Sequence, residues 1–288
     1  MTDPTRRIIA ATAGSLLAAG WLAAGENPPP PTARTDKSRF TLWEPVPRPL
    51  MREMSTDRPD QTESPYTVDA GHVQIELDFF NYTRSRDEGV KEWNIAPINV
   101  KVGLSHNVDV QLIFGGWVHQ KAAFPGLGAN SAEGIGDLTL RLKINLWGND
   151  GGDTAFGLMP FVKLPLRSDD IGNNEVEGGL IVPFAWKPGG VWSVGLMTEV
   201  DVVANDPGGG HHLEWLNSAT VGIDVTERIG AYVELVSVLA EAEGWSAQFD
   251  AGITFALTEN VQLDVGCNFG LAGAVPDYQP FVGMSVRF

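Results

Sequence analysis

The clearest indication of the fold is DLTLRLKINLW, residues 137–147. Leucine or isoleucine occupies every second position from Leu138 to Leu146, and polar residues fill the positions between them. A period of two places one set on each face of a β-strand, whereas an amphipathic helix would repeat its apolar residues every three to four positions. The stretch therefore predicts a strand that separates an apolar environment from a polar one.

The same alternation recurs along most of the chain. It is clear in HVQIELDFFNYT (72–83), INVKVGL (98–104) and VDVQLIF (108–114), and it continues after residue 155. The later candidate strands are 156–166, 180–187, 191–203, 213–225, 229–239, 247–257, 261–271 and 280–288. These segments predict about 12 strands between residues 71 and 288.

The connections between these strands alternate in length. Short ones are expected at 105–107, 148–154, 187–190, 226–228 and 258–260, and long ones at 84–92, 119–134, 167–179, 204–212, 240–246 and 272–279. An up-and-down outer-membrane barrel has short periplasmic turns and long outer loops. An even number of strands would leave both ends of the barrel in the periplasm.

A soluble β-sandwich or a lipocalin-like barrel would alternate too, with the apolar face buried. The strongly charged polar face and the length of the strands favour a membrane barrel, because a tilted crossing needs about 9–11 residues. The predicted fold class is therefore all-β, an antiparallel up-and-down transmembrane β-barrel that occupies residues 71–288.

Composition narrows the function. The net charge of −16 argues against binding to nucleic acid, which requires clustered Lys and Arg. A single cysteine, Cys267, allows neither a disulfide within the chain nor a cysteine-based metal site. The mean hydropathy of −0.06 excludes a polytopic helical membrane protein. Partners are expected to be outer-membrane lipid, the barrel assembly machinery and a small-molecule solute.

The first 54 residues differ from the rest. Residues 1–25 combine Arg6 and Arg7 with an apolar stretch and small residues, as a secretory signal peptide of a Gram-negative cell does. A single membrane anchor is the alternative. Residues 26–54 are rich in proline, which predicts a polyproline-like or disordered periplasmic tether.

In lipid, the polar face of each strand must point into the lumen. Two arcs of opposite charge are then expected on opposite sides of the ring. The basic arc consists of Lys101, Arg141, Lys143 and Lys163, and the acidic arc of Glu199, Asp201, Glu214, Asp224, Glu234, Asp250 and Asp264. The arcs predict either a transverse field across a wet pore or a set of salt bridges that fills a narrow lumen.

Motifs for catalysis or cofactor binding are weak. His211-His212 sits in an expected outer loop without a third ligand at diagnostic spacing, so solvated histidines are preferred over a metal site. No nucleophile elbow or phosphate-binding glycine motif occurs, and no cofactor or enzyme activity is predicted. An outer-membrane lipid hydrolase remains as a minor alternative.

Three stretches carry a family resemblance: STDRPDQTESPYTVDAGHVQIE (55–76), GIGDLTLRLK (134–143) and QPFVGMSVRF (279–288). They resemble the outer-membrane, transporter-like proteins grouped as the putative MetA-pathway of phenol degradation. This resemblance implies an outer-membrane barrel that passes hydrophobic or aromatic compounds, and it implies no catalytic residues.

The segment 55–70 is either a plain lead-in to the first strand or a plug at the periplasmic mouth, built on Asp57, Arg58, Asp60 and Glu63. The terminal Phe288 is similar to the aromatic signal that the assembly machinery recognises. Together these features predict a porin-like channel for passive uptake of small solutes. The alternative is a structural or adhesive barrel with a closed lumen.

Overall fold

A computed structural model describes residues 36–86, 89–124, 128–166, 171, 175–205, 209–241 and 244–288. The signal peptide predicted at 1–25 and the first part of the predicted tether lie outside these residues. In the described part of the chain, no helix is long and apolar enough to cross a membrane.

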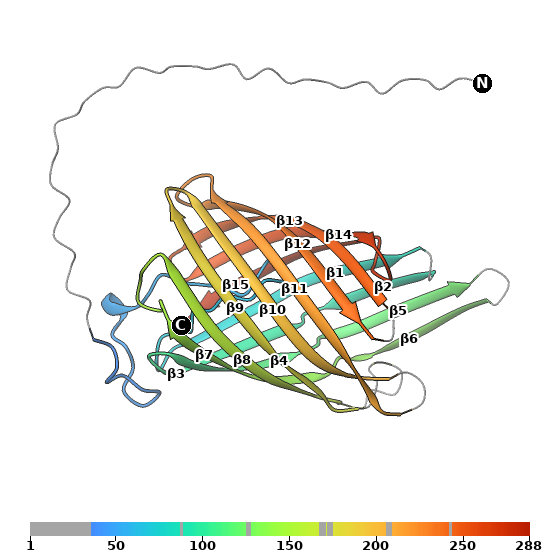
Figure 1. Ribbon diagram of the computed structural model, residues 1–288, viewed down its shortest axis with the longest axis horizontal. Helices are drawn as coiled ribbons and strands as arrows, with labels where there is room; N and C mark the ends of the chain where they lie inside the picture. Colours follow the sequence, from blue (N-terminus) through green and yellow to red (C-terminus); the bar gives the residue numbers. More distant parts are fainter. Residues whose placement is uncertain are drawn as a thin grey trace, which may run out of the picture. The chain divides into compact units, whose positions relative to one another are not determined.

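The described chain forms a closed antiparallel β-barrel (Figure 1). Hydrogen bonds join each wall segment to the next, and β1 pairs with β15 to close the ring. The strands are β1 (Val73–Ser85), β2 (Val90–Ile95), β3 (Ile98–Ser105), β4 (Val108–Phe114), β5 (Trp117–Phe124), β6 (Gly128–Ile135), β7 (Leu138–Trp147), β8 (Thr154–Leu164), β9 (Glu177–Gly189), β10 (Trp192–Ala204), β11 (His211–Asp224), β12 (Ile229–Ala240), β13 (Gly244–Thr258), β14 (Val261–Ala272) and β15 (Tyr278–Arg287). The predicted fold class is confirmed.

Three of the 12 wall segments are each broken into two strands: β2 with β3, β4 with β5, and β6 with β7. The predicted loops at 84–92 and 119–134 were therefore too long, because β1 runs to Ser85, β2 starts at Val90, and β5 and β6 fill most of 119–134. The end of β1 and the strands β2, β5 and β6 form a sheet that extends the barrel wall outward (Figure 1). In this extension, β6 pairs only with β5 among the described strands.

Backbone chemistry explains the breaks. Pro97 has no N–H to donate to a ladder, and Ala96 before it has a positive φ of 55°. At the next two breaks Gly115 and Gly136 lie against each other, and a Cβ on either would come within 2.8 Å of the other's backbone. Gly136, in the stretch GIGD (134–137), thus allows two backbone segments of the barrel wall to approach closely.

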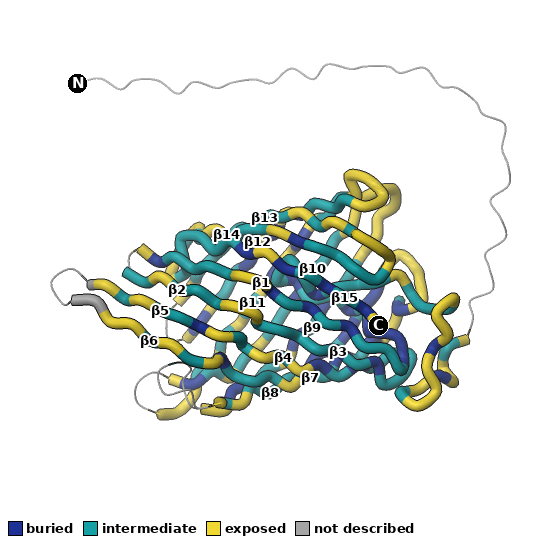
Figure 2. The backbone as a smooth tube through the Cα atoms, turned by 180° about the vertical axis from the view of Figure 1, so that it is seen from behind, coloured by how far each residue is buried: buried dark blue, intermediate teal, exposed yellow. Residues whose placement is uncertain are grey.

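The outward face of the barrel is apolar. Large hydrophobic side chains along the strands are exposed, among them Leu140, Leu196, Leu235 and Val265, whereas their lumen-facing neighbours are buried or half-buried. Figure 2 shows exposed and buried positions following one another along the strands. Exposed tryptophans lie near strand ends: Trp147, Trp186, Trp192, Trp215 and Trp245. This arrangement matches an outer-membrane barrel with aromatic girdles.

Residues 36–54, which fall in the predicted tether, contact one end of the barrel. Phe40 and Val46 pack with Ala70 in a small buried cluster, and a short 3-10 helix spans Arg48–Leu50. Backbone hydrogen bonds join Leu42 to Leu104 and Val46 to Ala70. The prolines do prevent regular helix and central strand, but side-chain packing still fixes the segment at the end of the barrel where the chain terminates.

A charge placed on the lipid face should cost stability according to its depth. Leu235 is 58% exposed and lies in the middle of β12, and Leu239 is 53% exposed near its outer end. We expect Leu235→Arg to destabilise the barrel by about 2–4 kcal/mol and Leu239→Arg by at most about 1 kcal/mol. Reversible unfolding in lipid vesicles measures both. Equal costs would contradict the outward placement of β12 in a bilayer.

Candidate functional site

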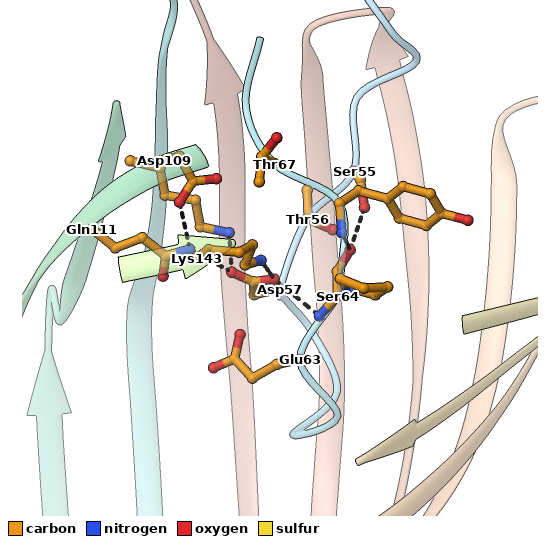
Figure 3. A network of polar contacts seen from close by, with 12 residues as sticks. Ser55, Thr56, Asp57, Glu63, Ser64, Thr67, Asp109, Gln111 and Lys143 are labelled. Carbon is orange, nitrogen blue, oxygen red and sulfur yellow. Dashed lines mark hydrogen bonds and ion pairs between the residues drawn. The ribbon is translucent and has the colours of Figure 1, made fainter. Parts of the chain in front are cut away.

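Residues 55–64 form a loop that enters the lumen and returns (Figure 3). The hydroxyls of Ser55 and Ser64 lie 2.7 Å apart and close its neck, and the Ser64 N–H donates to Asp57 at 3.1 Å. Below the neck, the Arg52 guanidinium donates to the Thr67 carbonyl at 3.2 Å. Both ends of this lumen loop therefore lie together, as in compact Ω-loops.

One side of the lumen loop faces the basic residues of β3 and β7. The Asp57 carboxylate forms ion pairs with both Lys101 and Lys143, whose side chains are only 2% and 1% exposed. Glu63 forms an ion pair with Arg141. Lys101 also contacts Glu76 of β1, which in turn accepts the Asp57 N–H. A buried charge needs such partners, because removal from water is costly.

The other side of the lumen loop faces the acidic residues of β12 to β14. The Arg58 guanidinium lies 2.6 Å from Asp264 and 2.6 Å from Asp78. Glu234 accepts the backbone N–H groups of Gln61 at 2.8 Å and of Thr62 at 2.7 Å.

The same side has two further contacts. The Gln61 amide donates to Asp250 at 3.3 Å, and the Thr62 hydroxyl contacts Ser218 of β11. The lumen loop thus presents carboxylates to the basic arc, and a guanidinium and N–H donors to the acidic arc.

Residues 65–70 leave the lumen along β4 and β7. Asn145 donates to the Pro65 carbonyl at 2.9 Å, Asn149 donates to the Thr67 hydroxyl at 2.7 Å, and Asp109 accepts the Val68 N–H at 2.9 Å. These contacts anchor the chain between the lumen loop and β1, so the loop enters from a fixed point.

A second ionic cluster lies at the end of the barrel where the chain terminates. Arg52 and Lys37 both contact Asp69 and Asp150, and Arg287 lies 3.9 Å from Asp69. Partial burial alone would raise the pKa of Asp150, but its hydrogen bonds to Arg52 and Lys37 and their charges outweigh burial and lower that pKa. The cluster joins the N-terminal segment to the last strand.

Several predicted arc residues do not contact the lumen loop. Lys163 pairs with Asp137 and Glu177 in the wall, and Glu214 pairs with His212. Glu199 and Asp201 share the lumen side of β10, and Asp224 is exposed at the end of β11.

The other predicted positions are also defined. The Asp60 carboxylate lies near Glu234 and Thr220. Phe288 is exposed, and its N–H donates to the Val73 carbonyl at 2.8 Å.

The predicted outer histidines have ordinary hydrogen bonds. His211 contacts the Val176 carbonyl and His212 contacts Asn205 as well as Glu214. Within the described ranges, no group of three or more His, Cys, Asp or Glu residues is placed to hold a metal ion.

The sequence did not identify Gln61 and Thr62 as contact residues. Both bind Glu234 through backbone N–H groups, which any residue except proline supplies, so residue type carried no signal for that contact. Glu76 and Asp78 were placed in the lumen by alternation, but nothing in their spacing indicated the loop as their partner.

The closed ring, apolar exterior and polar interior define an outer-membrane β-barrel protein. The chain belongs to the family described as "Putative MetA-pathway of phenol degradation", whose profile matches residues 56–288, and the resemblance is thereby confirmed. The matched range starts within the lumen loop and covers the whole barrel.

Solved structures show the same fold. The COG4313 outer membrane channel from Pseudomonas putida F1 is 15% identical, with a TM-score of 0.59 over 81% of this chain and 100% of that chain. The NanC porin is 8% identical, with a TM-score of 0.50 over 74% of this chain and 98% of that chain. No curated protein matches this chain.

Proposed function

We propose that this protein is an outer-membrane channel for passive uptake of small solutes, and that the lumen loop, residues 55–64, is a plug that limits passage. The observation that carries the proposal is the chemistry of the lumen. Its wall and loop meet through ion pairs and hydrogen bonds, whereas a purely structural barrel could fill its interior with apolar side chains at lower desolvation cost.

The solute class follows from the family. Its description refers to phenol degradation, and the similar structure from Pseudomonas putida F1 is titled an outer membrane channel. We infer that the solutes are small hydrophobic or aromatic compounds. Such molecules diffuse across an outer membrane poorly without a channel, and uptake down a gradient requires no energy source or cofactor.

A structural barrel with a closed lumen is the second candidate. It is favoured by the number of directions from which the loop is held, since contacts come from β1, β3, β7 and β11 to β14. In that case the two charged arcs would serve only to fix the loop.

Liposome swelling with graded solutes separates the two candidates. Vesicles that contain the protein should swell in small aromatic alcohols faster than in sugars of increasing size, and vesicles with Leu239→Arg, which leaves the lumen unchanged, should behave in the same way. Swelling no faster than in protein-free vesicles for every solute would overturn the channel proposal and support the closed barrel.

A further inference from the structure

The outward face of the barrel extension carries a row of cations. Arg84 of β1 lies directly opposite Lys91 of β2, and Lys91 lies directly opposite Lys121 of β5. Residues opposite each other in an antiparallel ladder project to the same face with Cβ atoms about 5 Å apart, and like charges there are destabilising. Three adjacent strands therefore hold like charges side by side.

This row faces outward. Trp93 shares its face with Lys91, and the Lys121 ammonium lies 5.6 Å from the Trp93 ring centroid. Tyr82 and His119 flank that ring at 5.4 and 5.6 Å. Further along the same faces, Ile95, Trp117 and Ile135 are exposed. The cations lie two residues beyond the aromatic row, about 7 Å further from the barrel centre.

Among the described residues, the row has no ion-pair partner. None of Arg84, Lys91 and Lys121 forms an ion pair with another residue described in the structure. Of the described carboxylates nearby, Asp277 contacts Arg86 and Glu133 contacts His119.

The outward cations are also concentrated in one part of the barrel rim. In a chain of net charge −16, the described outer-end cations that do not point into the lumen are Arg84, Arg86, Lys91 and Lys121. Arg84 lies on β1, Lys91 on β2 and Lys121 on β5, and Arg86 directly follows β1. In the described part of the chain, these cations thus lie together on neighbouring strands.

We propose that Arg84, Lys91 and Lys121 bind the phosphate groups of an outer-leaflet glycolipid, with Tyr82 and Trp93 at the boundary between its headgroup and acyl chains. Aromatic side chains settle at that boundary, and basic side chains just beyond it attract anionic headgroups. A lipid is favoured over a soluble anion because the row continues an apolar wall.

The test uses the full mature protein purified in detergent, with binding of bisphosphorylated lipid A measured by native mass spectrometry. Lys91→Gln/Lys121→Gln should weaken binding about 30-fold, since each Lys near a lipid headgroup contributes roughly a fivefold gain. Lys91→Arg/Lys121→Arg should retain it. Lys187→Gln/Arg228→Gln, which removes the same charge from exposed positions at the periplasmic end, should change it little.

Three outcomes would overturn the proposal. Fully dephosphorylated lipid A could bind as tightly as the bisphosphorylated form, inorganic phosphate could displace the lipid at millimolar concentration, or the two glutamine double variants could lose affinity equally. Heat-modifiable migration on gels checks that each variant is folded. If Lys91→Gln/Lys121→Gln does not fold, Lys121→Gln alone should weaken binding about fivefold, and unchanged binding would contradict the proposal.

Discussion

Single channels that lack the lumen loop are expected to conduct ions several times better than the intact protein. The deletion can be made without pulling on the barrel, because the ends of the loop lie together: Ser55 contacts Ser64, and Arg52 contacts Thr67. Replacing residues 55–66 with a short Gly-Ser linker should leave the second ionic cluster around Asp69 intact. Water would then solvate the lysines that Asp57 now neutralises.

Planar-bilayer recordings measure this effect. Trp43→Ala is the matched control, because Trp43 is 89% exposed in the same N-terminal segment and has no place in the lumen. Unchanged conductance after the deletion would show that the loop does not limit passage, and the plug proposal would fail.

The deletion also gives access to the charged arcs. In the open barrel, Lys143→Glu should shift ion selectivity toward cations and Asp250→Lys toward anions if a transverse field acts on permeating ions. Selectivity that neither change alters would leave the arcs only their role in binding the loop.

Replacing the Asp57 carboxylate alone should free most of the lumen loop from the barrel wall. Asp57→Asn keeps the shape of the side chain but leaves Lys143 without its ion pair and Lys101 with only Glu76. Loss of one partner of a buried pair costs about 3–5 kcal/mol. The loop can instead leave the lumen, and water then reaches both lysines. The cost of the substitution therefore cannot exceed the free energy of releasing the loop. We therefore expect channel openings that approach the conductance of the deletion variant.

Two further variants test the origin of this effect. Asp57→Asn/Lys143→Gln removes both charges and should restore part of the closed state, which a double-mutant cycle of closed-state occupancy measures. Gly283→Val alters no charge, but a Cβ at Gly283 would lie 2.2 Å from the Arg58 guanidinium and 2.6 Å from the Leu77 carbonyl, so it should displace the loop and also strain the pairing of β1 with β15. Additive effects of Asp57→Asn and Lys143→Gln would contradict a direct interaction between the two side chains.

The sequence predicted the wall better than its contents. Alternation along 137–147 and its repeats predicted the strands because lipid on one side and lumen on the other impose a period of two. The extension escaped prediction because β5 and β6, WVHQKAAF and GANSAEGI, have no sustained apolar alternation. The charges of 55–63 indicated a functional segment, but their partners lie on distant strands whose order around the ring must be known first.

The contacts of the lumen loop also have an order in time. Arg58 and Asp264 are 206 positions apart, and Gln61 and Asp250 are 189 apart. During synthesis and export, the loop is complete long before its partners on β12 to β14 exist, and contacts across such separations form late because closing a long chain segment costs entropy. The loop therefore forms its contacts only after the barrel is complete. All of its ion pairs can form together only when β1 and β15 have joined the ring.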